Sequence, residues 1–262
     1  MSEKSKIVEA ADRIWNSIHT KATCEPIRDL LGETDVEAAY EAQQINTMRK
    51  LSAGEIIVGC KIGLTSFAVQ KQLGVDEPDF GMLTNVMMVN ENTPIPWSEL
   101  TQPKAEAEIA FILSKDIDKQ LNSIDELIES IAFASPAIEV VGSRIEGWNI
   151  RITDTIADNA SASHFVLGKS KVLLSQMDLE GCQMNMKRAG EIVSTGSGRA
   201  SMGNPLNAAL WLANTMIDKK AALKKGDIIL TGALGPIVAV NPGDEFHAEI
   251  DGLGTVSVSF GK

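Results

Sequence analysis

The stretch KAEAEIAFIL, residues 104–113, holds two glutamates two positions apart in an otherwise apolar run. Side chains of a β-strand alternate between the two faces of a sheet, so Glu106 and Glu108 would point the same way, with Cα atoms about 7 Å apart. Two buried carboxylates on one face repel each other and lose hydration, and a divalent cation relieves both costs. Because Ala and Glu also favour helices, a helix with solvated glutamates is the alternative interpretation.

The flanking residues favour the strand. Pro103 precedes the run and a Ser-Lys-Asp cluster at 114–116 follows it, so the run is short, which is more typical of a strand than of a helix. A further carboxylate, Glu139, stands in a second apolar run, SPAIEVVGSR at 135–144. A glutamate in a buried strand needs a partner. Three carboxylates with water completing the shell suit Mg²⁺ or Mn²⁺.

Composition excludes several classes of protein. The 262 residues are 44% hydrophobic and 23% charged, with a net charge of −11 and no basic cluster, which argues against nucleic acid and anionic membranes as partners. No signal peptide or membrane-spanning segment is predicted. The three cysteines are scattered and odd in number, so we expect no disulfide framework and a cytoplasmic protein. The three histidines lie far apart in the sequence, which argues against zinc.

The hydrophobic pattern divides the chain into an N-terminal helical region, residues 1–54, and a β-rich domain, residues 55–262. Helices are expected at 5–20 and from about residue 36 to Gly54, the second preceded by a capping-box spacing at Thr34 and Glu37. The apolar residues expected to face inward on the second helix are Val36, Ala39, Tyr40, Ile45, Met48 and Leu51.

The second region is expected to be a mostly antiparallel β body with inserted helices, which makes the fold class α+β. Its expected elements are a strand at 56–65, a helix at 66–74, a turn-rich loop at 75–83, a helix at 123–133, two antiparallel strands within 171–194, a helix that begins at Asn204-Pro205, and strands within 225–260. The glycines at 196–203 lack the spacing of a dinucleotide-binding loop.

Three other polar residues permit two interpretations each. Lys61 lies in the strand-like stretch IIVGCKIGLT and is either a residue at the sheet edge or a functional lysine. Asp79 in VDEPDFGML is either a solvated turn residue or a functional acid. Ser161 follows the Asp158-Asn159 turn and is either a backbone cap or a site hydroxyl.

Six motifs, in order along nearly the whole chain, carry a resemblance to a known family. They are IGLTS at 62–66, LGVDEPDFG at 73–81, PKAEAEIA at 103–110, IEVVGSRI at 138–145, DTIADNAS at 154–161 and ILTGALGP at 229–236. Together they resemble the 2-hydroxypenta-2,4-dienoate (2-keto-4-pentenoate) hydratases of the fumarylacetoacetate-hydrolase-like superfamily. The 4-oxalocrotonate decarboxylases form a sister group that shares most of them.

The resemblance implies a mixed β-roll that holds Mg²⁺ or Mn²⁺. It implies that Glu106, Glu108 and Glu139 are the metal ligands, and that Lys61 and Asp79 are catalytic. Lys61 is expected to bind the substrate carboxylate or donate a proton, and Ser161 is expected to lie near the substrate. The family also implies a homo-oligomer built from pentamers, such as a pentamer or decamer, that serves meta-cleavage degradation of aromatic compounds.

The expected reaction is the addition of water to a 2-hydroxydienoate, giving 4-hydroxy-2-oxopentanoate. Asp79 is the expected base for the added water, because it would lie near the metal without binding it. Decarboxylation needs no such acid, and the decarboxylase group lacks the PDFG-type aspartate, so Asp79 and the GALGP ending favour a hydratase. One departure is the sequence ASHF after DNAS, where many hydratases have a Cys-Gly pair, which leaves a longer substrate tail open.

Three alternatives remain at this point. The chain could be a 4-oxalocrotonate decarboxylase, a hydratase of a longer 2-hydroxydienoate, or a non-catalytic partner that associates with a decarboxylase or aldolase. The intact lysine, aspartate and three glutamates argue against the last. A carbon–carbon bond hydrolase would need a histidine motif that the three histidines do not form.

Overall fold

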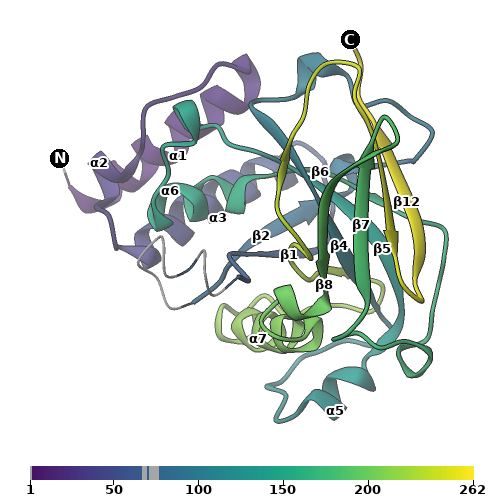
Figure 1. The fold of residues 1–262 in the computed structure, drawn as a ribbon. Helices are drawn as coiled ribbons and strands as arrows, with labels where there is room; N and C mark the ends of the chain where they lie inside the picture. Colours follow the sequence, from purple (N-terminus) through teal and green to yellow (C-terminus); the bar gives the residue numbers. More distant parts are fainter. Residues whose placement is uncertain (1, 67–69, 71–76) are drawn as a thin grey trace.

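A curled β-sheet forms the centre of the molecule. In Figure 1 the N-terminal helices lie at its left, two later helices lie at its lower end, and a second sheet lies at its right. A computed structural model describes residues 2–66, 70 and 77–262. The helices are α1 (Glu3–Thr20), α2 (Arg28–Leu31), α3 (Val36–Ser52), α5 (Ile124–Ile128), α6 (Ile152–Ala157) and α7 (Pro205–Asp218). The expected α+β class and mixed β-roll are confirmed.

The strands are β1 (Ile57–Gly63), β2 (Asp79–Thr84), β3 (Met88–Val89), β4 (Pro103–Leu113), β5 (Ile131–Gly142), β6 (Ala162–Leu167), β7 (Gln183–Arg188), β8 (Glu191–Ser197), β9 (Ile228–Leu230), β10 (Val238–Ala239), β11 (Glu245–Ile250) and β12 (Gly254–Ser259). Short 3-10 turns are η1 (Asn85–Met87), η2 (Trp97–Glu99), η3 (Glu146–Trp148), η4 (Asn159–Ser161), η5 (Leu174–Gln176) and η6 (Gly198–Ala200).

The central sheet runs in the order β2-β1-β9-β4-β5-β6-β3, and β10 pairs with β4 at the end of that strand. Strands β1 and β9 pair in parallel, as do β3 and β6, while the other pairs described in this sheet are antiparallel. The prediction of a mostly antiparallel body is therefore confirmed. The two longest strands, β4 and β5, lie in the middle of the sheet, where both are hydrogen-bonded on each side.

The second sheet is antiparallel, in the order β12-β11-β7-β8. Burial along β11 alternates strictly, so one face of this sheet turns inward. Its buried residues Phe246, Val256 and Val258 share a hydrophobic core with Ile109 and Phe111 of β4. The odd-numbered residues of β4 therefore face this core, which turns Glu106 and Glu108 to the opposite face.

The N-terminal helices pack against α6 rather than standing apart. Ile7 and Ile14 of α1 and Ala39 of α3 share a hydrophobic cluster with Ile152 and Ile156 of α6. An element from the later part of the chain thus completes the core of the first part. The division at residue 54 stays a prediction.

The inward face predicted for α3 is partly wrong. Met48 is 54% exposed, whereas the polar residues Gln43 and Asn46 are buried. Both amides donate to backbone carbonyl groups, Asn46 to Ala11 O of α1. These hydrogen bonds offset the cost of burying the amides, so tertiary contacts rotate the helix away from its most apolar stripe.

Several element boundaries also differ from expectation. The N-cap of α3 is Asp35, whose side chain accepts from Ala38 N, rather than Thr34. Helix α5 begins after Ser123 as expected but ends at Ile128, because residues from Ile131 onward pair with β4. Asn204 and Pro205 begin α7 as predicted. The helix predicted at 66–74 lies almost wholly outside the described residues.

Candidate active site

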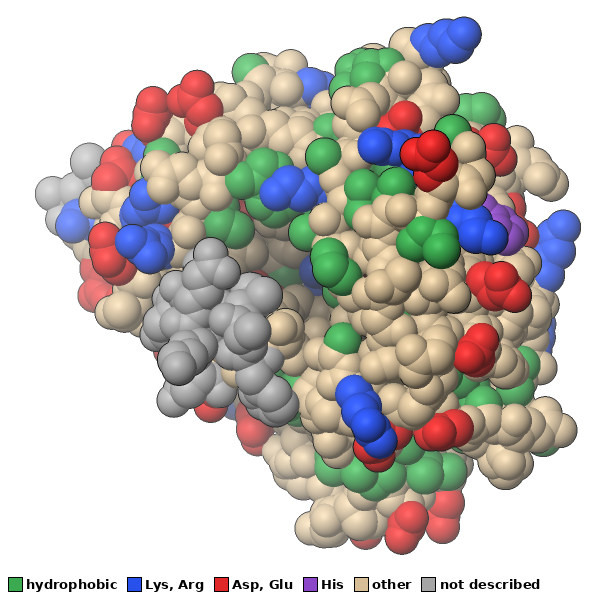
Figure 2. Space-filling view, in the orientation of Figure 1, with side chains coloured by type: hydrophobic (Ala, Val, Ile, Leu, Met, Phe, Trp, Pro, Cys, Tyr) green, Lys and Arg blue, Asp and Glu red, His purple; other side chains and the backbone are tan. Residues whose placement is uncertain are grey.

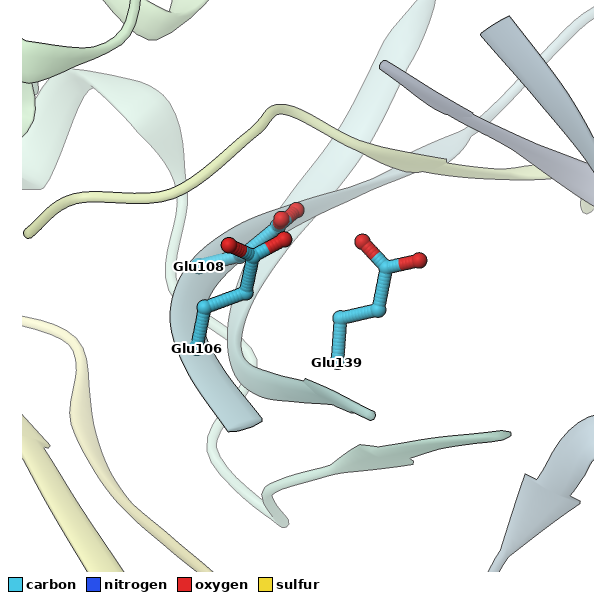
Figure 3. A group of neighbouring side chains, drawn as sticks. All are labelled: Glu106, Glu108 and Glu139. Atoms are coloured by element: carbon cyan, nitrogen blue, oxygen red, sulfur yellow. The ribbon is translucent and has the colours of Figure 1, made fainter. Parts of the chain in front are cut away.

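Three glutamate side chains converge on the face of the central sheet that β4 turns away from the hydrophobic core (Figure 3). Strand β4 pairs with β5 so that Glu106 lies directly opposite Glu139, and Glu108 follows two residues along the same face. Carboxylate oxygens of all three lie within 4.8 Å of one another. Figure 2 shows a hollow near the middle of the view, on the face of the molecule that Figure 1 also presents.

Burial raises the pKa of the glutamates in this cluster. Glu108 and Glu139 are fully buried, and burial raises the pKa of both, together with repulsion from the neighbouring glutamates. The pKa of Glu139 rises to about 7, and that of Glu106 is also raised, chiefly by burial. Among the described residues, Glu108 Oε1 and Glu139 Oε1 have no hydrogen-bond partner. The carboxylates are therefore held together without enough donors to satisfy them.

One lysine faces the cluster. Lys61 of β1 is only 2% exposed, and its Nζ lies 3.2 Å from Glu139 Oε2 and donates to Ala160 O at 3.0 Å. Burial by itself would lower the pKa of Lys61, but the surrounding carboxylates, Glu139 foremost, raise it above its ordinary value. Lys61 is therefore a buried ammonium of the site, and the interpretation as a residue at the sheet edge is wrong.

Asp79 is buried as well. It is 1% exposed and begins β2, opposite Gly63 of β1, so the interpretation as a solvated turn residue is wrong. Its Oδ2 accepts from Thr155 Oγ1 at 3.2 Å, while its Oδ1 has no partner within the described part of the chain. Burial raises the pKa of Asp79 and the Lys61 ammonium opposes that rise.

Gly63 explains how the aspartate and the lysine fit together. A Cβ at this position would lie 2.1 Å from Asp79 Oδ1 and 3.5 Å from Lys61 Nζ. The aspartate oxygen thus occupies space that any other residue at position 63 would fill. Both charged groups therefore lie close to the space that the missing side chain leaves.

Ser161 lies on a strained turn beside the lysine. Asn159, Ala160 and Ser161 all have left-handed backbone angles, with φ of 58°, 49° and 56°. The Asn159 side chain bonds both the amide and the carbonyl of Met82, which fixes the turn to β2. The Ser161 hydroxyl is buried without a hydrogen-bond partner in the described residues. Consecutive left-handed non-glycine residues are costly and cluster at functional sites.

Sequence reasoning missed two contacts that shape the site. Thr155 has no role assigned from the sequence, yet it lies in α6 and its hydroxyl donates to Asp79. Gly232 donates its amide to Glu108 Oε2 at 2.9 Å, and its φ of +92° suits glycine. The motifs DTIADNAS and ILTGALGP contain both residues, but spacing alone gives neither partner.

The donor set fits a hard divalent cation. All three converging groups are oxygen ligands, two of them with unpartnered buried atoms, and one ammonium faces them. Mg²⁺ and Mn²⁺ prefer carboxylate oxygens completed by water. Such an ion would remove the repulsion that raises the pKa of the glutamates.

Comparison with known proteins identifies the family. The fumarylacetoacetate (FAA) hydrolase C-terminal family matches residues 60–260. The chain is 54% identical to 2-keto-4-pentenoate hydratase 1 of Dechloromonas aromatica (strain RCB) over 90% of this chain and 89% of that protein. It is 50% identical to the TodF product hydratase of Pseudomonas putida (strain F1) over 97% and 95%. The chain therefore belongs to the FAA hydrolase family, and the resemblance to the hydratases is confirmed.

A solved structure shares the fold over almost its whole length. The 4-oxalocrotonate decarboxylase from Pseudomonas putida G7, complexed with magnesium and adipate, superposes with a TM-score of 0.93 at 31% identity, and 98% of each chain is covered. The sister group expected from the sequence is thus found as a structural neighbour. Among the described residues of this chain, no helix is both long and apolar enough to span a bilayer.

Proposed function

We propose that this protein is a 2-keto-4-pentenoate hydratase, a hydro-lyase that adds water to 2-hydroxypenta-2,4-dienoate and releases 4-hydroxy-2-oxopentanoate. The observation that carries the proposal is Asp79, a buried aspartate beside Lys61 and next to a cluster of three glutamates, with one oxygen that accepts no hydrogen bond from the described residues. Relatives about 50% identical over nearly the full chain carry the hydratase name. The sequence alone favoured the same activity.

Glu106, Glu108 and Glu139 would hold Mg²⁺ or Mn²⁺ by their converging oxygens. When bound, the cation supplies Lewis acidity that stabilises the enolate form of the 2-oxo acid. The structural neighbour complexed with magnesium supports this assignment. The buried Lys61 ammonium would pair with the substrate carboxylate or act as a proton donor to the substrate. The Ser161 hydroxyl, which has no partner among the described residues, would hydrogen-bond the substrate.

Asp79 would accept the proton of the water that adds at C4. Burial raises its pKa, which makes its carboxylate a stronger base than a solvated aspartate. Its Oδ1 is the atom suited to this task, since Oδ2 accepts from Thr155 while Oδ1 has no partner among the described residues. The substrate gains a proton at C5, a hydroxyl at C4 and a proton at C3 and loses its enol proton, so the net change is the addition of one water.

The second candidate is a 4-oxalocrotonate decarboxylase, favoured by the structural neighbour at 31% identity. A direct assay separates the two. Protein loaded with Mg²⁺ or Mn²⁺ is offered 2-hydroxypenta-2,4-dienoate and, separately, 2-oxohex-3-enedioate. Loss of the dienol with formation of 4-hydroxy-2-oxopentanoate supports the hydratase, and carbon dioxide released from the diacid as the dominant reaction would overturn it. A 2-hydroxydienoate with a longer tail tests the remaining alternative.

The cellular setting is part of the same proposal. We expect a cytoplasmic homo-oligomer, a pentamer or decamer, which acts in meta-cleavage degradation of aromatic compounds and associates with a decarboxylase or aldolase of that pathway. Sedimentation velocity of the purified protein measures the oligomer, and a monomer would contradict it.

A further inference from the structure

We propose that Thr155 and Gln43 are positioning residues that hold Asp79 with one carboxylate oxygen free, so that helix α3 is a fixed support of the site. The inference rests on the proposed role of Asp79 as the base. It assigns a task to the N-terminal helices, which supply none of the charged groups of the site described above.

Thr155 determines which oxygen of Asp79 is bound. Its hydroxyl donates to Asp79 Oδ2 at 3.2 Å, whereas Asp79 Oδ1 accepts no hydrogen bond from the described residues. Without it the carboxylate would be free to rotate, because the terminal torsion of aspartate is broad. With it, Oδ1 stays in the space left by Gly63.

Gln43 fixes the distance between the two partners of that hydrogen bond. Its Nε2 donates to Phe80 O and to Ile156 O, each at 2.9 Å. Phe80 directly follows Asp79, and Ile156 directly follows Thr155. One amide nitrogen uses both of its hydrogens to tie the segment of Asp79 to the segment of Thr155.

The surroundings of Gln43 make this tie stiff. Gln43 is 4% exposed, and one turn earlier on α3 the ring of Tyr40 stacks on Phe80 with centroids 4.5 Å apart and planes 16° apart. Helix α3 therefore holds Phe80 by its backbone and by its side chain. Breaking a buried amide away from two carbonyl groups leaves all three unpaired, which disfavours any outward motion of the helix.

The test uses isosteric variants with matched controls. Thr155→Val removes the hydroxyl at constant shape and should lower kcat for hydration about 10- to 100-fold, since misplacing a catalytic group by about 1 Å has effects of this size. Mg²⁺ affinity and KM should change less than about threefold, because the lost interaction acts only in the reaction. Thr155→Ser should restore kcat. An unchanged kcat in Thr155→Val would overturn the proposal.

Gln43→Met should lower kcat in the same way, whereas Gln44→Met, at the exposed neighbouring position on α3, should not. If Gln43 acts through the Thr155–Asp79 bond, the double variant Gln43→Met/Thr155→Val loses little more than Thr155→Val alone. Fully additive losses would show that Gln43 has only a structural role. The Thr155 variants bury no new polar atom, so they test the proposal even if Gln43→Met does not fold.

A crystal structure of Thr155→Val separates this inference from the proposed function. The wild-type assay decides the function first. The structure then decides the positioning without any assay: Asp79 Oδ1 is expected to leave its place against Gly63. A carboxylate that stays there refutes the positioning role, whatever the wild type catalyses.

Discussion

Replacement of Glu139 by glutamine should make the metal-free protein more stable at alkaline pH. The side chain is fully buried in the glutamate cluster, and burial and the neighbouring carboxylates raise its pKa from 4.5 to about 7. Glutamine keeps the shape and the oxygen but carries no charge. The variant therefore removes an unfavourable charge from the folded state.

The size of the effect follows from linkage between protonation and folding. A folded-state pKa above the unfolded value means that ionisation disfavours the folded state. The penalty is absent below about pH 4.5, grows as pH rises, and is complete above about pH 7. A rise from 4.5 to about 7 corresponds to about 3 kcal/mol, which in a chain of this size is roughly 6–12 °C in Tm.

Thermal unfolding of chelator-treated protein at pH 4.5 and pH 8 measures this directly. The Tm difference between Glu139→Gln and wild type should be small at pH 4.5 and positive at pH 8. Saturating Mg²⁺ should stabilise the wild type by about 3 kcal/mol at roughly 100 times its Kd and should stabilise the variant much less. Mg²⁺ should therefore abolish most of the stability difference between the two proteins at pH 8.

Glu245→Gln provides the control, because Glu245 is an exposed glutamate on β11. It should leave both the pH dependence and the Mg²⁺ effect unchanged. The reasoning is refuted if metal-free Glu139→Gln is no more stable than wild type at pH 8. Equal stabilisation of both proteins by Mg²⁺ would remove Glu139 from the proposed ligand set.

Three other variants test the rest of the site. Asp79→Asn should keep Mg²⁺ affinity by calorimetry but lower kcat about 100-fold or more, as expected for loss of a general base; normal hydration would exclude Asp79 as the base. Gly232→Ala should lower the free energy of unfolding by about 1–3 kcal/mol and weaken metal binding, because its φ is +92° and its amide donates to Glu108. Asn159→Ala loses two hydrogen bonds to Met82 and should destabilise by about 1–3 kcal/mol in urea unfolding.

The strand that carries two of the three clustered glutamates could be predicted because its signal is local. Alternation of apolar residues in 104–113 placed Glu106 and Glu108 on one face, and the structure has both on the same face of β4. The isolated Glu139 in an apolar run predicted a partner, and β5 brings it opposite Glu106. A charge inside a buried strand conflicts with its surroundings, and such conflicts point to functional sites.

The burial of Lys61 and Asp79 could not be derived from local pattern. Both have ordinary solvated interpretations in sequence, and only the pairing of β1 with β2 brings them together across Gly63. Resemblance to the family gave their expected roles, but their surroundings come from the fold. The buried face of α3 could not be derived from local pattern either. Gln43 can be buried there because its amide donates to the carbonyl oxygens of Phe80 and Ile156, which are far from it in sequence.

The sequence by itself determined the α+β class, the acidic strand and the family, because these depend on periodicity and on motifs along the chain. Only the tertiary structure decided which oxygen of Asp79 accepts from Thr155, which carboxylate Lys61 pairs with, and which carbonyl groups Gln43 of α3 binds. These features depend on contacts between residues far apart in sequence. Whether such a contact offsets the cost of burying a polar group is settled by distances that local pattern does not contain.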